Sequence, residues 1–131
     1  MIFLTLKTDN PEAEIGLFSG SGAELSYIRW QAHRELASTI HRQIEELLTS
    51  QGMSWQNIDG LICFQGPGSF TGLRIGLTVA NAMAYGLEIP IVATMDEDWI
   101  KKGIERLHAG EDDHIALPHY GAPVHITQQK K

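Results

Sequence analysis

The length, composition and charge of the chain exclude several classes of protein before any motif is considered. Its 131 residues fit one domain, and a hydrophobic share of 43% is enough for a buried core. The net charge of −6 argues against a protein that grips nucleic acid unaided, because binding the phosphate backbone needs clustered Lys and Arg. Cys63 is the single cysteine, so no disulfide can form within the chain, and no run approaches the roughly 18 apolar residues of a membrane span. We therefore expect a soluble protein of the cytoplasm.

Three short strands joined by turns are predicted at the start of the chain. Apolar runs indicate strands at residues 2–6, 14–18 and 24–30. Asp9-Asn10-Pro11 is a turn signal after the first strand, and the glycine-rich residues 19–22 form a turn after the second. Short strands joined in this way predict an antiparallel meander.

Helices and strands are predicted to alternate over the next part of the chain. An apolar stripe at helical spacing predicts a helix over residues 33–50, and its members are Leu36, Ile40, Ile44, Leu47 and Leu48. We then expect a buried strand at 58–64, a helix at 71–85 that Gly86 closes, and a strand at 89–94. A last helix is predicted at 95–107, with the acidic residues 96–98 in its first turn.

This order of elements predicts an α/β fold with an antiparallel start. It matches the ribonuclease H-like unit from which the lobes of actin-like ATPases are built. Residues 1–108 are predicted to form this lobe. Residues 109–131, which are rich in Gly, Pro and His and end in Lys130-Lys131, are predicted to be a flexible tail with little regular structure.

A glycine-rich turn between strand 58–64 and helix 71–85 allows two interpretations. One is a phosphate cradle, since helix N-termini attract anions; its candidate residues are Gly66, Gly68, Ser69 and Thr71. The other is a structural elbow, in which Ser69 or Thr71 accepts from the first free N–H groups of the helix. The P-loop pattern fails because no lysine follows Gly72, and the glycine spacing does not fit the dinucleotide pattern either. The residues favour the elbow and leave the phosphate site open.

Small residues recur at every fourth position of the predicted helix 71–85. They are Gly72, Gly76, Ala80 and Ala84. A row of this kind makes a groove in which another element can approach closely. Two interpretations remain open, because the row can pack on its own sheet or can face the helix of a partner.

Neither a catalytic group nor a metal site is predicted from the residues. The sequence around Ser69 is not the G-x-S-x-G nucleophile elbow, and a capping role for its hydroxyl is favoured. His33 and His41 are two helical turns apart, too far to chelate one ion together. The remaining histidines fit no zinc spacing.

The stretch from the glycine turn into the following helix resembles the TsaB (YeaZ) family, bacterial partner proteins in making N6-threonylcarbamoyladenosine on tRNA. The resemblance is carried by Gly66-Pro67-Gly68-Ser69-Phe70-Thr71-Gly72-Leu73-Arg74-Ile75-Gly76 and, further on, by Ile89-Pro90-Ile91-Val92. It covers about residues 1–100. It implies a single lobe of the actin-like ATPase (ASKHA) fold, no catalysis by this chain alone and no cofactor.

The resemblance also implies a heterodimer with the paralogue TsaD, which carries the metal and the threonylcarbamoyl-transfer site, and a TsaE-type ATPase in the assembled complex. The interface helices of the family correspond to residues 33–50 and 71–85. The implied interface residues are His33, Leu36, Ile40, Phe70, Gly72, Leu73, Arg74, Gly76 and Ala80. Two alternatives stay open: a nucleotide-binding or hydrolytic enzyme that uses the turn 66–72, and a homodimer of the lobe alone. No direct contact with nucleic acid or membrane is expected.

The chain departs from the pattern of the resembled family in two places. Members of that family usually have a second lobe, whereas here residues 118–131 already resemble the family's C-terminal tail. The chain therefore looks like a first lobe joined to that tail. The family's first strand usually ends in Ile-Asp-Thr, where this chain has Leu6-Lys7-Thr8. A lysine cannot coordinate Mg²⁺, which disfavours ATP hydrolysis further.

Overall fold

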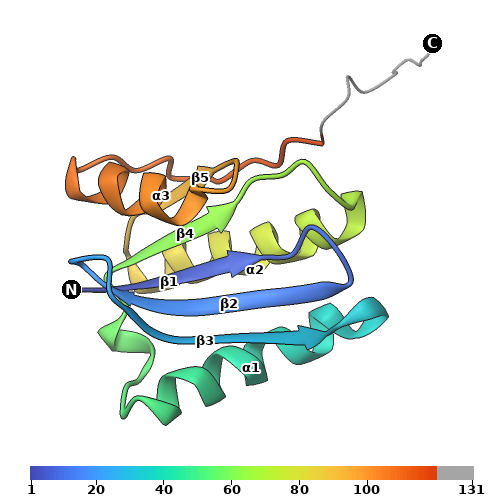
Figure 1. The fold of residues 1–131 in the computed structure, drawn as a ribbon, viewed down its shortest axis with the longest axis horizontal. Coiled ribbons are helices and arrows are strands. Elements are labelled where there is room, and N and C mark those ends of the chain that lie inside the picture. The colour runs from blue at the N-terminus through green and yellow to red at the C-terminus, as the bar shows by residue number, and fades with distance from the viewer. Residues whose placement is uncertain (121–131) are drawn as a thin grey trace.

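A computed structural model describes residues 1–120, and the strands of this part of the chain form one mixed sheet (Figure 1). The strands are β1 (Ile2–Lys7), β2 (Glu12–Ser19), β3 (Glu24–Gln31), β4 (Gly60–Phe64) and β5 (Ile91–Thr94). Their order across the sheet is β3-β2-β1-β4-β5. The pairs β1–β2 and β2–β3 are antiparallel, as the predicted meander requires, and β4 and β5 are added in parallel to β1.

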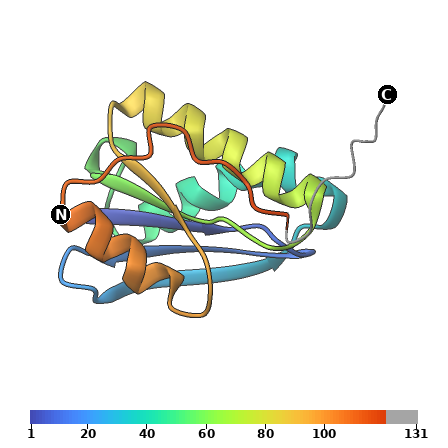
Figure 2. The ribbon, with the colours of Figure 1, turned by 90° about the horizontal axis from the view of Figure 1, so that it is seen from above.

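Helices cover both sides of the sheet (Figure 2). On one side lie α1 (Leu36–Ser50) and α2 (Phe70–Leu87), and on the other lies α3 (Trp99–His108). The alternation of side chains along a strand sends Leu61 and Cys63 toward α1 and α2, and Ile62 toward α3. The central strand β4 is therefore apolar on both faces, as predicted.

The predicted fold class is confirmed. The strand order and the alternation of helix and strand after β3 are those of the ribonuclease H-like, ASKHA-type lobe. The apolar stripe of α1 is buried at every predicted position, from Leu36 at 5% exposure to Ile40 and Ile44 at 0%.

The helices on the α1–α2 side begin and end differently from the prediction. Residues His33–Glu35 form a 3-10 turn, in which His33 has a φ of +46°, and the α-helix starts only at Leu36. Gly86 does not close α2. That helix continues to Leu87, and Glu88 ends it in the left-handed conformation with a φ of +58°.

The predicted start of the last helix at residue 95 was wrong. Asp96 has a φ of +77°, which a helix cannot contain, and α3 begins at Trp99. The acidic residues therefore precede the first turn of the helix. Lys102 reaches back to them, with its Nζ 2.8 Å from Asp96 and 3.2 Å from Asp98.

Residues 109–120, called the strap below, have no helix or strand but lie against β4, β5 and α2. The rest of the predicted tail, residues 121–131, lies outside the described residues, and with it most of the stretch that resembles the family's C-terminal tail. None of the helices in residues 1–120 has the length and hydropathy needed to cross a bilayer.

Candidate functional site

The polar groups of Ser69, in the glycine turn between β4 and α2, form hydrogen bonds with other groups of the same chain. The Ser69 hydroxyl caps α2 and accepts a hydrogen bond of 3.3 Å from the Gly72 N–H, as the elbow interpretation predicts. The Ser69 N–H donates to the Asp9 carbonyl at 2.7 Å, and the Leu73 N–H donates to the Ser69 carbonyl at 2.9 Å. These bonds tie the start of α2 to the β1–β2 turn and give the glycine stretch a structural role.

The candidate phosphate-site residues do not surround one space. Gly66, with a φ of +124°, allows the His119 carbonyl to approach where a Cβ would overlap it, and Gly68 does the same for Asp9. Ser69 and Thr71, in contrast, line a cavity of about 800 Å³ beside His33. The four residues are thus divided between backbone packing and a cavity wall.

Lysine at the end of β1, where the resembled family usually has aspartate, has partners in this fold. The Lys7 Nζ lies 2.7 Å from an Asp9 carboxylate oxygen and 4.6 Å from the centre of the Phe64 ring. Lys7 thereby joins β1, the β1–β2 turn and β4, which accounts for a cation at this position.

Of the two interpretations left open for the row of small residues, the contacts favour packing on its own sheet over a face turned to a partner helix. A Cβ added at Gly76 would overlap the Thr8 side chain, and one at Gly72 would overlap the Thr8 carbonyl. The Thr8 hydroxyl donates to the Gly72 carbonyl at 2.8 Å. Ala80 is 0% exposed. The row is the surface by which α2 lies on the end of β1.

Burial also separates the remaining predicted interface residues into two groups. Leu36, Ile40 and Leu73 are between 0% and 5% exposed, so they belong to the core. His33, Phe70 and Arg74 are exposed. Because a side chain without exposed surface cannot touch another protein, only the second group can contribute to an interface.

A groove between α1 and α2 adds residues that the sequence did not single out. Its volume is about 380 Å³, and it is lined by Ala37, Thr71, Arg74, Ile75, Thr78 and Val79. Within the whole of α2, Arg74 is the one charged residue. The signal that could have found this face is the lack of charge at the exposed positions of a surface helix.

An aromatic corner adjoins this groove at the start of α2. Phe70 is 54% exposed, and its ring stacks on that of Tyr120 with 4.6 Å between centroids and 29° between planes. The Arg74 guanidinium lies 5.2 Å from the centre of the Phe70 ring. Arg74 therefore borders both the groove and the aromatic corner.

Two further observations concern chemistry. Cys63 is buried, and this burial raises the pKa of its thiol to about 12, so the thiol stays protonated at neutral pH. Residues 1–120 contain no cluster of three or more His, Cys, Asp or Glu side chains arranged to hold a metal ion.

Comparisons with known proteins agree on one family. The family model "TsaD: tRNA N6-adenosine threonylcarbamoyltransferase" matches residues 30–96, about half of the chain. The TsaB protein of Escherichia coli, a "tRNA threonylcarbamoyladenosine biosynthesis protein", is 38% identical over 92 residues, which cover 62% of this chain and 40% of that protein. TsaB of Haemophilus influenzae is 28% identical over 128 residues, which cover 98% of this chain and 53% of that protein.

A solved structure gives the same result. YeaZ from Pseudomonas aeruginosa matches with a TM-score of 0.67 and 25% identity, over 78% of this chain and 50% of that one. The chain spans about half the length of the curated TsaB relatives it matches. Sequence, sheet order and structural likeness lead to the same conclusion: the chain belongs to the TsaB/TsaD family, as a TsaB (YeaZ) member.

Proposed function

We propose that this chain is a non-catalytic partner subunit that binds TsaD and supports the formation of N6-threonylcarbamoyladenosine on tRNA. The proposal takes its reaction from the names of the relatives, which are TsaB proteins of threonylcarbamoyladenosine biosynthesis. The matching family model bears the name of TsaD, so the two kinds of protein share a lobe. Related lobes can pair through equivalent faces, as the subunits of a two-fold dimer do.

The observation that carries the proposal is the outer face of α1 and α2. It has a groove of about 380 Å³, and α2 contributes one charge, Arg74, over its whole length. Depletion of charged residues marks the core of protein–protein interfaces, and an isolated Arg is enriched there. A partner helix can lie in this groove with an apolar face and one carboxylate opposite Arg74.

The non-catalytic part of the proposal is supported by the roles of the nucleophile-type side chains. Ser69 caps α2, Thr8 is bonded to the Gly72 carbonyl, and Cys63 is a buried, protonated thiol. Each of these groups has a structural role in the lobe. In the proposed complex the transfer chemistry belongs to TsaD.

The proposal also includes the wider assembly. In this proposal a TsaE-type ATPase joins the TsaB–TsaD pair in the cytoplasm, and the acidic chain makes no direct contact with tRNA. A homodimer formed by the chain alone uses the α1–α2 face as well. TsaD should therefore displace the second copy rather than add to it.

The test is binding of the purified chain to TsaD from the same genome, measured by calorimetry and by sedimentation. We expect a one-to-one complex at micromolar concentration or tighter. Failure of the pair to associate in either measurement would overturn the proposal. Rapid turnover of ATP by the chain without TsaD would favour the enzymatic alternative instead.

A charged side chain introduced into the groove tests whether the groove is part of the surface that binds TsaD. In Ala37→Lys the affinity for TsaD should fall by roughly a hundredfold, because a second cation in the groove that Arg74 already lines is left without a partner when the complex forms, and a buried, unpaired charge at an interface costs about 2–5 kcal/mol. Ala23→Lys is the matched control, since Ala23 is also exposed but lies in the β2–β3 turn. Equal affinities of the two variants would show that TsaD binds elsewhere on the chain.

A further inference from the structure

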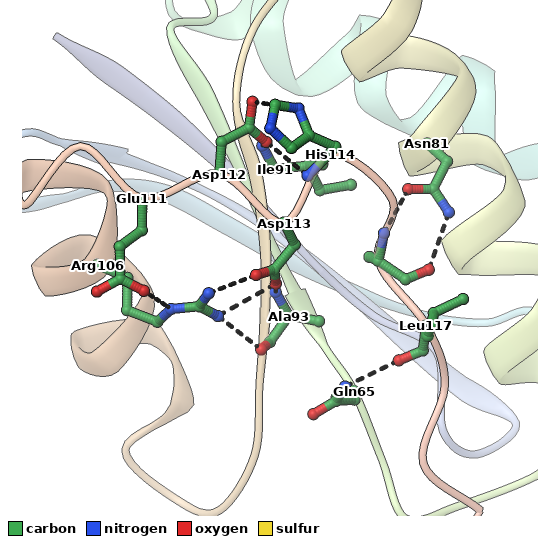
Figure 3. A network of polar contacts seen from close by, with 11 residues as sticks. Gln65, Asn81, Ile91, Ala93, Arg106, Glu111, Asp112, Asp113, His114 and Leu117 are labelled. Atoms are coloured by element: carbon green, nitrogen blue, oxygen red, sulfur yellow. Dashed lines mark hydrogen bonds and ion pairs between the residues drawn. The ribbon is translucent and has the colours of Figure 1, made fainter.

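The strap is fastened to the edge strand β5 by backbone and side-chain hydrogen bonds (Figure 3). The Asp113 N–H donates to the Ile91 carbonyl at 2.8 Å. The carboxylates of Asp112 and Asp113 accept from the Ile91 and Ala93 N–H groups at 3.1 and 2.9 Å. An edge strand with open N–H groups invites pairing with other chains, and here the strap satisfies two of those groups.

A second set of contacts fixes the strap where it crosses α2 and β4 (Figure 3). The Asn81 side chain of α2 forms two hydrogen bonds with the backbone of Ala116. It accepts from the Ala116 N–H at 2.8 Å and donates to the Ala116 carbonyl at 3.0 Å. The Gln65 side chain donates to the Leu117 carbonyl at 2.9 Å, and the His119 N–H donates to the Gln65 carbonyl at 2.8 Å. The path of the strap is therefore defined as far as residue 119.

This path ends at the start of α2, beside the proposed TsaD surface. Tyr120 follows directly and stacks on Phe70 with 4.6 Å between ring centroids. Phe70 keeps 54% of its surface exposed in spite of this stacking. Arg74, which lies 5.2 Å from the Phe70 ring centre, also lines the groove. The groove, Arg74, Phe70 and Tyr120 thus form one continuous surface drawn from three separate parts of the chain, α1, α2 and the strap.

We propose that the strap makes Tyr120 part of the TsaD-binding surface. This inference rests on the proposed function and specifies which part of the chain completes it. Within residues 1–120 no carboxylate forms an ion pair with Arg74, although the chain as a whole carries a net charge of −6. A TsaD segment with a carboxylate for Arg74 and an apolar side chain for the two rings has the complementary chemistry. Arg74 is exposed and Tyr120 is half-buried, and Tyr and Arg side chains beside a groove with no other charge are typical anchors of such contacts.

The strap has a positioning role in this proposal. Asn81 does not line the groove, but it holds Ala116, four residues before Tyr120, against α2. Without this anchor Tyr120 must lose more conformational freedom when the complex forms, and that loss weakens binding. Asn81 therefore acts on TsaD only through Tyr120.

The experiment measures the affinity of the full chain for TsaD with single and combined substitutions. Tyr120→Ala should weaken binding roughly tenfold, the scale of a moderate interface anchor. Tyr120→Phe, which keeps the ring, should bind as the unmodified chain does. Tyr85→Ala is the matched control: Tyr85 is 89% exposed at the far end of the same helix, and its removal should leave the affinity unchanged.

A double-mutant cycle tests the positioning role. Asn81→Ala should weaken binding severalfold, yet Asn81→Ala combined with Tyr120→Ala should bind no more weakly than Tyr120→Ala alone. Circular dichroism of each variant checks that the lobe is folded. Additive losses would show that Asn81 acts on stability and not through Tyr120, which overturns the strap's role.

The outcomes separate this inference from the proposed function. If the unmodified chain binds TsaD and Tyr120→Ala binds equally well, the inference is wrong and the proposed function stands. If the unmodified chain does not bind TsaD, both are wrong.

Discussion

The two helical layers on either side of the sheet are held by different kinds of contact. On the α1–α2 side, small residues let the helix come close enough to touch β1, with Gly76 against Thr8 and Ala80 at 0% exposure. On the α3 side, a smaller apolar cluster around Trp99 and Leu107 is supplemented by charge. Arg106 of α3 binds Glu111 and Asp113 of the strap and donates to the Ala93 carbonyl at 3.1 Å.

This difference explains where the chain can offer a surface to a partner. The inner face of α2 is fixed by shape, so its outer face needs no charges to hold the helix in place, and Arg74 is the one charge that α2 carries. In the α3 layer, Lys102 and Arg106 form ion pairs with acidic residues of the same chain. The stability of the α1–α2 layer should therefore depend on side-chain volume, and that of the α3 layer should depend on pH. Each expectation can be tested separately.

The largest effect is expected from Gly76→Ala, which breaks the close contact of the α1–α2 layer. The added methyl group would overlap Thr8, which is 4% exposed and held by its bond to the Gly72 carbonyl, so it cannot move aside cheaply. We expect a loss of about 2 kcal/mol in the free energy of unfolding, in the range found for overpacked cores. Urea denaturation followed by circular dichroism measures it.

Gly86→Ala is the matched control for this substitution. Gly86 lies in the same helix, and an added Cβ there would meet no atom within 4 Å beyond its chain neighbours and the backbone of its own helix. Alanine is the better helix former by about 1 kcal/mol, so this variant should be more stable than the original chain. The same chemical change should thus have opposite signs at the two positions. A stabilising Gly76→Ala would show that α2 has room to move away from β1.

A smaller effect, and one that depends on pH, is expected on the α3 side. Burial on its own would raise the pKa of the Asp113 carboxyl, but hydrogen bonds from Arg106 and the Ala93 N–H, with the charge of Arg106, hold that pKa below its usual value. Because the folded-state pKa is lowered, the stabilisation is present above the unfolded value of about 3.9 and is lost as the pH falls through the folded value. Asp113→Asn should therefore cost about 1 kcal/mol at pH 7, and the difference should shrink below about pH 4.

Unfolding by urea at pH 7, 5 and 3.5 checks this prediction. Glu97→Gln is the control, because it removes one negative charge from an exposed side chain near the start of α3. Its stability should follow that of the original chain at each pH. If Asp113→Asn loses the same stability at pH 3.5 as at pH 7, the contribution of Asp113 comes from packing and not from its charge.

Most of the fold could be predicted from the sequence, because its signals are local. The apolar stripe of α1 and the alternation of strands with helices depend on residues close together in the chain. The capping role of Ser69 is of the same kind, since the acceptor and the Gly72 donor are three residues apart. The ends of the helices were harder to predict from the sequence. Asp96 and Glu88 take positive φ values, which neither residue type indicates.

The candidate site could be predicted only in part, because it depends on contacts between distant segments. The row of small residues signals a close approach, but the sequence does not say that its neighbour is Thr8 and not a partner helix. The strap has no periodic pattern at all. Its path depends on hydrogen bonds from the Asn81 and Gln65 side chains to backbone atoms of residues 116 and 117. Because every residue has the same backbone groups, the identities of residues 116 and 117 do not indicate that they take part in such bonds.

The smallest effect is expected at the C-terminal end of α2, away from the contacts discussed above for the two helical layers. Glu88 ends the helix in the left-handed conformation, with a φ of +58°. Glycine adopts this conformation without the steric penalty of a Cβ, although it also gains freedom in the unfolded chain. Glu88→Gly should therefore raise the free energy of unfolding by no more than about 1 kcal/mol. Because the gain arises from backbone strain alone, urea denaturation should show it equally at pH 7 and pH 5 and equally in the Gly76→Ala background; dependence on either would mean that the helix end is coupled to one of the layers.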